Sequence, residues 1–189
     1  DIDSVVKPLL AKTGVDVSAL PEELLGLLQN PQNLSLYCKI SSVCHDAHPK
    51  TAWQLCDCFA DEVVRKDVLL GESAIGFLEE QASKMMSERR DSFLYSEIRI
   101  PAEMLQRLVS QGILFERTGR YSFAHQTLME NFIVHDVLKR NLSLRDFILS
   151  HPPLPFIRPT VRVLFFHLEN QDQRKFVRQV REVISSDDV

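Results

Sequence analysis

"PAEMLQRLVSQGILFERTGRYSFAH", residues 101–125, contains the pattern of a helix followed by the pattern of two strands. Pro101 suits the opening of a helix, and Gly112 suits its end because glycine adopts the left-handed conformation found there. Residues 113–116 and 120–124 are rich in residues that favour strands, and Thr118-Gly119 between them suits a tight turn. The stretch therefore predicts a helix followed by a two-stranded β-hairpin.

The residues before this stretch add a second helix and an extended segment. Residues 69–90 place apolar side chains at helical spacing and end in two arginines, which the negative end of a helix favours. Residues 91–101 are β-prone and suit a short strand. Helix, extended segment, helix and hairpin is the order of a winged helix, a variant of the helix-turn-helix module. With a further helix at 127–140, we expect a winged-helix domain at residues 67–141.

The amino-terminal region has the pattern of a small helical subdomain, residues 1–66. Ser18 can cap a Leu-rich helix, with Pro21 as its first helical residue. Pro31 ends that helix and opens the next, because the residue before a proline avoids helical geometry. Two amphipathic helices follow. The apolar face of the first contains Leu34, Tyr37, Cys38, Ile40 and Val43, and that of the second contains Trp53, Leu55, Cys56, Phe59 and Val63.

Residues 142–189 predict a helical hairpin that could begin an array of helical repeats. Prolines 152, 153, 155 and 159 exclude helix locally, and residues 160–171 and 172–185 then form two helical patterns in succession. The predicted fold class is therefore mainly α: a helical subdomain, a winged helix with a two-stranded wing, and the start of a helical region.

The amino-acid composition does not indicate a binding partner. The formal net charge is −4, so no basic field points to nucleic acid or to an anionic membrane. No apolar run approaches the length of a membrane span, and the first residues lack a signal peptide, so we expect a cytoplasmic location. The chain begins without Met and ends in "SSDDV", which favours a piece of a longer protein.

Four cysteines lie close together in the sequence, at positions 38, 44, 56 and 58, beside His45 and His48. The nearest pairs, Cys44/His48 and Cys56/Cys58, do not have the spacing of common zinc knuckles. Cysteine is among the most buried residue types, so buried thiols are the favoured interpretation. A zinc or disulfide role is the alternative.

Catalytic motifs are absent from the sequence. It contains no G-x-S-x-G nucleophile elbow. "GESAIGFL", residues 71–78, spaces its two glycines as a phosphate-binding loop does, but Phe77 and Leu78 replace the lysine and the hydroxyl residue that contact phosphate and magnesium. We therefore expect no enzyme activity from this chain.

DNA binding is the first alternative function, since the second helix of a winged helix often enters the major groove. Gln106 and Gln111 could contact bases, and Arg117 and Arg120 could contact phosphate. However, Glu103 faces Arg107 on the same helix and Glu116 adjoins the wing arginines, so a solvated wing is favoured and nucleic acid is not the expected partner. A helical scaffold for protein partners is the second alternative.

Two segments resemble the NACHT group of STAND-class signalling ATPases. "PEELLGLLQNPQNLSLYCKI", residues 21–40, is similar to the helical domain that follows the nucleotide-binding core in that family. "RYSFAHQTLMENFIVHDVL", residues 120–138, resembles the end of its winged-helix domain, an aromatic-x-Phe-x-His pattern followed by an apolar residue, an acid and an aromatic. Asn131 stands between Glu130 and Phe132, which departs from that pattern.

The resemblance implies a regulatory module of a nucleotide switch used in signalling and defence, with the Walker A and Walker B motifs upstream. His125 then corresponds to the histidine that reaches the β-phosphate of ADP, and Pro31 to the proline that packs on adenine. It implies no cofactor in this chain alone and ADP or ATP with Mg²⁺ in the whole protein, whose core would be the partner of this chain. Further protein partners could bind the carboxy-terminal helices.

Simpler structural roles exist for each of these residues. A histidine after a strand is often the first residue of a helix or a half-buried packing group. Pro31 could only initiate its helix. Glu130 could be an acid that favours the positive end of its helix, and a link to His125 is the alternative. We expect Tyr37, Cys38, Trp53 and His135 to pack in the core.

Overall fold

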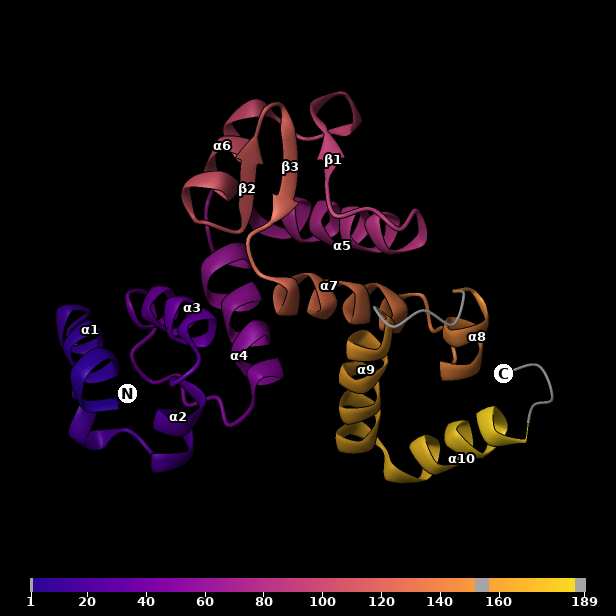
Figure 1. Ribbon diagram of the computed structural model, residues 1–189, viewed down its shortest axis with the longest axis horizontal. Coiled ribbons are helices and arrows are strands. Elements are labelled where there is room, and N and C mark those ends of the chain that lie inside the picture. Colours follow the sequence, from indigo (N-terminus) through magenta and orange to yellow (C-terminus); the bar gives the residue numbers. More distant parts are fainter. Residues whose placement is uncertain (1, 152–156, 186–189) are drawn as a thin grey trace. The chain divides into compact units, whose positions relative to one another are not determined.

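Helices make up 67% of the chain, and a small three-stranded antiparallel sheet accompanies them (Figure 1). This computed structural model describes residues 2–151 and 157–185. The mainly α class predicted from the sequence is confirmed. None of the helices in the described ranges is long and apolar enough to cross a membrane.

Internal packing divides the chain into two units. Unit 1 comprises residues 1–77 and 99–115, and unit 2 comprises residues 78–98 and 116–189. The division crosses helix α5 (Gly71–Ser87) and strand β2 (Leu114–Arg117). The domain limits expected above, 1–66, 67–141 and 142–189, stay predictions.

Unit 1 is built from short helices joined by tight connections. In chain order these are α1 (Lys7–Lys12), which continues a π-helical segment at Ile2–Val6, a 3₁₀ turn at Val17–Ala19, α2 (Glu22–Leu27), α3 (Pro31–Ser41), α4 (Ala52–Phe59) with a π-helical continuation at Ala60–Arg65, and α6 (Ala102–Ser110).

Polar side chains cap the starts of helices α3 and α4. The Asn30 side chain accepts a 2.9 Å hydrogen bond from the backbone N–H of Gln32, so Pro31 becomes the first residue of α3. Thr51 accepts a 3.1 Å bond from the N–H of Gln54 at the start of α4. Ser18, expected to cap the Leu-rich helix, instead lies in the 3₁₀ turn, where Asp16 accepts its N–H and hydroxyl.

The packing of α3 on α4 forms the core of unit 1. Tyr37, Ile40, Leu55 and Phe59 are buried, and the Tyr37 hydroxyl donates a 3.2 Å bond to the carbonyl of Ala47 in the following turn. Val43 was expected on the same apolar face but is 59% exposed, because α3 ends at Ser41 and Val43 lies beyond it.

The end of α6 follows the prediction made for Gly112. This glycine has φ +61°, and its N–H donates to the carbonyl of Val109 at 2.8 Å. The N–H of Ile113 donates to the carbonyl of Leu108 at 3.0 Å, which completes a Schellman motif. The Lys39 ammonium group donates to the carbonyl of Gln111 and satisfies a further free acceptor of the helix.

The sheet has the strand order β1-β3-β2, with β1 at Phe93–Leu94 and β3 at Arg120–Phe123. Phe93 pairs with Tyr121 in antiparallel register. Thr118 and Gly119, between β2 and β3, both have positive φ, 51° and 75°, as a two-residue hairpin turn requires. The predicted hairpin is therefore confirmed to within one residue at each strand.

Unit 2 continues, within the described residues, with four helices that follow the hairpin. They are α7 (Gln126–Lys139), α8 (Leu144–Leu149), α9 (Ile157–Gln171) and α10 (Gln173–Ile184). Helix α7 packs on α9, and α10 contacts both α8 and α9. Ser83 on α5 donates a 2.7 Å bond to Asp136 on α7, which fixes these two helices side by side. Phe132, Phe147 and Leu164 lie in the resulting core.

Pro159, the last of the four closely spaced prolines, lies inside a helix. Pro159 lies in the first turn of α9, so the expectation that it excludes helix is wrong. The first turn tolerates proline because its N–H would have no helical partner there. Prolines 152, 153 and 155 lie outside the described residues. Asp172 separates α9 from α10 and caps α10 by accepting the N–H groups of Arg174 and Lys175.

Candidate functional site

His125 lies where the hairpin ends and α7 begins. Strand β3 ends at Phe123, and His125 is the N-cap residue of α7, with extended backbone angles of φ −134° and ψ 124°. Its carbonyl accepts the N–H of Met129 at 3.2 Å, as the first helical bond requires. Its imidazole is half-buried and makes no cap hydrogen bond to the helix. Local helix chemistry therefore explains the backbone of His125 but not its side chain.

In the part of the chain that the structure describes, four other helices have a side-chain cap at their first turn, whereas α1, α2 and α6 do not. Asn30, Thr51, Ser143 and Asp172 each accept a backbone N–H of the helix that they begin. The first turn of α7 also contains no acidic residue. The positive end of this helix dipole therefore keeps its attraction for an anion.

Pro31 is the first residue of α3, and its ring is exposed. Because Asn30 already caps the helix, the proline adds a fixed φ at a position where no N–H is needed. Helix initiation is thus a sufficient account of the backbone at Pro31, and its exposed ring remains accessible. Pro31 belongs to unit 1 and His125 to unit 2.

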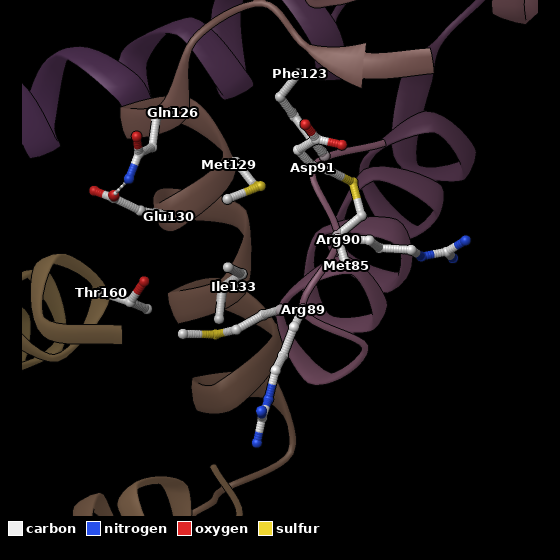
Figure 2. A pocket seen from close by; sticks show the side chains of 11 residues that line it. Met85, Arg89, Arg90, Asp91, Phe123, Gln126, Met129, Glu130, Ile133 and Thr160 are labelled. Carbon is white, nitrogen blue, oxygen red and sulfur yellow. Dashed lines mark hydrogen bonds between the residues drawn. The ribbon is translucent and has the colours of Figure 1, made fainter. Parts of the chain in front are cut away.

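A cavity of about 350 Å³ lies in unit 2, beside the first turns of α7. Figure 2 shows its walls, which come from the end of α5, the end of β3, α7 and the first turn of α9. Much of the lining is apolar and includes Met85, Met86, Phe123, Met129 and Ile133. A volume of this size suits a small molecule.

Glu130 is the buried acid of this cavity. It is 5% exposed, and its Oε1 accepts a 2.9 Å hydrogen bond from Nε2 of Gln126. Figure 2 shows the two side chains turned toward each other. Burial raises the pKa of Glu130, and the hydrogen bond from Gln126 opposes that effect only in part.

From its position in the sequence, Glu130 was expected to be an acid that favours the positive end of its helix, and its burial was not predicted. A signal was present, because Leu128, Phe132, Ile133, Val134 and Val137 cover most directions around α7. A helix that is apolar on nearly all sides is surrounded by protein, and a carboxyl group within it is buried as well.

Arg90 is held at one side of the cavity by acidic neighbours. Its Nη1 and Nη2 donate to the two carboxylate oxygens of Glu97 at 2.7 and 2.6 Å, and Glu88 lies 2.8 Å from its Nε. The Arg90 bonds, a backbone bond from Leu94 and the Lys84 ammonium hold the pKa of Glu97 well below its usual range. This network fixes the link from α5 to β1.

The side chains expected in the core, and the four cysteines, differ in their burial. Tyr37 and Cys56 are buried, whereas Trp53, Cys38 and His135 are half-buried. All four cysteines are free thiols, and burial raises the pKa of Cys38 and Cys58. Among the residues that the structure describes, no group of three or more His, Cys, Asp and Glu side chains could hold a metal ion.

The residues considered for DNA contact lie on separate elements. Arg107 pairs with Asp67 instead of the Glu103 expected from the sequence. Arg117 and Arg120 are exposed on the hairpin, and Arg120 donates from Nε to the Ser92 hydroxyl at 2.9 Å. The Gly71 to Gly76 segment considered as a phosphate loop lies within helix α5.

Comparison with protein-family models, curated proteins and solved structures gives no match to this chain.

Proposed function

We propose that this chain is the nucleotide-sensing, autoinhibitory module of a STAND-class NACHT ATPase. In this proposal a P-loop core upstream holds ADP, and the present chain closes over that nucleotide. His125 bonds the β-phosphate and Pro31 packs on the adenine. Exchange of ADP for ATP with Mg²⁺ breaks the phosphate contact and releases the module. The chain itself contributes binding and movement, and the core contributes hydrolysis.

The N-cap position of His125 carries this proposal. Helices α3, α4, α8 and α10 begin with a side chain that accepts a free N–H group, whereas α7, like α1, α2 and α6, has no side-chain cap. An imidazole at the positive end of a helix can donate a hydrogen bond to a phosphate oxygen while the helix dipole favours the same negative charge. The residue is therefore better suited to an anion than to helix capping.

The order of elements supports the winged-helix part of the proposal. Helix α5, strand β1, helix α6 and the β2–β3 hairpin follow one another in the chain, and β1 joins the sheet beside β3. This is the element order expected of a winged helix. His125 follows the hairpin directly, so the hairpin would set the direction of approach of the imidazole to the nucleotide.

The experiment compares ADP retention in the full-length protein and in its His125→Ala variant. Loss of one hydrogen bond to a charged phosphate predicts an ADP affinity lower by about tenfold or more. His48→Ala is a suitable control because His48 is an exposed histidine in unit 1. Equal ADP affinity and equal basal ATPase activity in the wild type and His125→Ala would remove the proposed contact.

A sequence observation tests the proposal independently. The polypeptide that contains this chain is expected to carry G-x-x-x-x-G-K-[ST] upstream of residue 1, because the chain contains no P-loop of its own. A full-length protein without that motif would leave His125 with no nucleotide to bind.

A further inference from the structure

The cavity of unit 2 has one polar centre, formed by Glu130 and Gln126. Gln126 donates its amide N–H to Oε1 of Glu130, and no other described residue donates to either carboxylate oxygen. A buried carboxylate with a single neutral donor is far from satisfied, because an ionised oxygen pair accepts several hydrogen bonds. The cavity thus has an unused acceptor for a positively charged donor.

The two arginines near the cavity leave this acceptor available. Arg90 is occupied by Glu97 and Glu88, and Figure 2 shows its side chain extending away from Glu130. Arg89 is exposed, and Figure 2 shows its side chain pointing away from Glu130. Since neither guanidinium group pairs with Glu130, the inner part of the cavity retains an acidic character.

The side chains that line the cavity could contact the apolar part of a ligand, and that part could vary in shape. Met86, Met129 and Ile133 line the same cavity as Glu130. Methionine side chains are flexible and polarisable, and they adapt to ligands that differ in outline. The buried Thr160 adds a small polar surface from α9.

We propose that this cavity binds a small primary or secondary amine, with the ammonium group on Glu130 and the apolar body among Met86, Met129 and Ile133. An ammonium group supplies both the charge and the hydrogen bonds that Glu130 lacks. A carboxylate or phosphate ligand would meet repulsion from Glu130, and a neutral ligand would leave its charge uncompensated. This site does not depend on the nucleotide role of His125.

The four methionines of the chain provide a direct test. Met85, Met86 and Met129 line the cavity, whereas Met104 lies on α6 in unit 1. Phenethylamine is titrated into the chain labelled with carbon-13 at the methionine methyl groups, and single Met→Leu variants assign the four signals. The three cavity methyl signals are expected to shift with one saturable affinity while the Met104 signal stays in place.

Two matched probes separate charge from apolar burial. Phenethyl alcohol has the same apolar body without the charge, and phenylpropionate carries the opposite charge. The amine is expected to bind about tenfold or more tightly than the alcohol, because it forms a charged hydrogen bond to a buried acceptor. Equal affinity for all three probes, absence of saturable shifts with the amine, or equal shifts at Met104 would each overturn the proposal.

Glu130→Gln tests the named acceptor while keeping the side-chain shape. The variant is expected to lower the affinity for phenethylamine to that for phenethyl alcohol, and to leave the affinity for the alcohol unchanged. Glu80→Gln is the matched control, because Glu80 is exposed on α5 and does not line the cavity. Unchanged amine affinity in Glu130→Gln contradicts the proposal. If this variant does not fold, the comparison of the three probes on the wild-type chain decides.

Discussion

Arg107 on α6 donates from Nε to Oδ2 of Asp67 at 2.8 Å, and its Nη2 lies 2.8 Å from the same oxygen. The two residues are 40 positions apart, and the pair fastens α6 to the segment that precedes α5 within unit 1. Burial acts to raise the pKa of Asp67, but the bonds from Arg107 and from the N–H groups of Leu69 and Leu70 lower it overall.

The first prediction concerns the pH dependence of this pair. Because the pKa of Asp67 is lowered in the folded state, the pair stabilises the fold above the unfolded pKa of 3.8, and this stabilisation is lost as the pH falls through the folded pKa. Arg107→Ala is expected to lower the free energy of unfolding by about 1 kcal/mol at pH 7, since the pair is partly exposed. Urea unfolding at pH 7 and below pH 3.8 measures both values. A loss of equal size at the two pH values would contradict the assignment.

The second prediction concerns Glu130, whose pKa is raised by burial. A raised folded pKa means that folding favours the protonated acid, so stability is highest below the unfolded pKa of 4.5 and falls as the pH rises through the folded pKa. Glu130→Gln is neutral at every pH, and we expect it to raise the free energy of unfolding at pH 7 by about 1 kcal/mol. Chemical unfolding at pH 4 and pH 7 checks this, and a gain of the same size at both would show that charge is not the cause.

The third prediction contrasts two glycines. Gly112 has φ +61°, and an added Cβ would lie 2.7 Å from the Lys39 ammonium nitrogen, so Gly112→Ala is expected to lower the free energy of unfolding by about 1 to 2 kcal/mol. Gly76 lies inside α5, with nothing within 4 Å of an added Cβ. Gly76→Ala should therefore raise stability by about 0.5 to 1 kcal/mol. Thermal unfolding of the two variants is expected to give shifts of opposite sign.

The fourth prediction separates the stability of α7 from the proposed use of its N-cap. The backbone of His125 already has the extended geometry that a capping residue adopts. His125→Asn adds a cap acceptor that His125→Ala lacks, so the Asn variant should be more stable than the Ala variant by about 1 kcal/mol. Both variants lose the imidazole, so both should retain ADP equally poorly in the full-length protein.

The same pair of variants also limits the interpretation of His125. If the Asn variant is no more stable than the Ala variant, the N-cap geometry at this position does not favour capping. If the Asn variant retains ADP as the wild type does, the contact needs only a polar side chain and the imidazole has no special role. Measurement of unfolding and of ADP retention on one set of proteins distinguishes these results.

Local rules allowed several elements to be predicted from the sequence alone. Pro31 after Asn30 marks the start of α3, Gly112 marks the end of α6, and Thr118-Gly119 marks the hairpin turn. The position of His125 between hairpin and helix was found for the same reason. Each of these features depends on backbone angles and hydrogen bonds within a few residues, and the residue types at those positions determine them.

The tertiary structure decided which side chains are buried and what surrounds them. Val43 has the apolar spacing of a core residue but is exposed beyond the end of α3. Glu130 has the sequence position of an early helical acid but is buried, because α7 is covered by α9 and by the second half of α5. Burial depends on contacts between segments distant in the chain, and helical spacing specifies only the face of a helix. The sequence therefore determined where the elements begin and end, and tertiary packing determined that a cavity with an acid inside it exists.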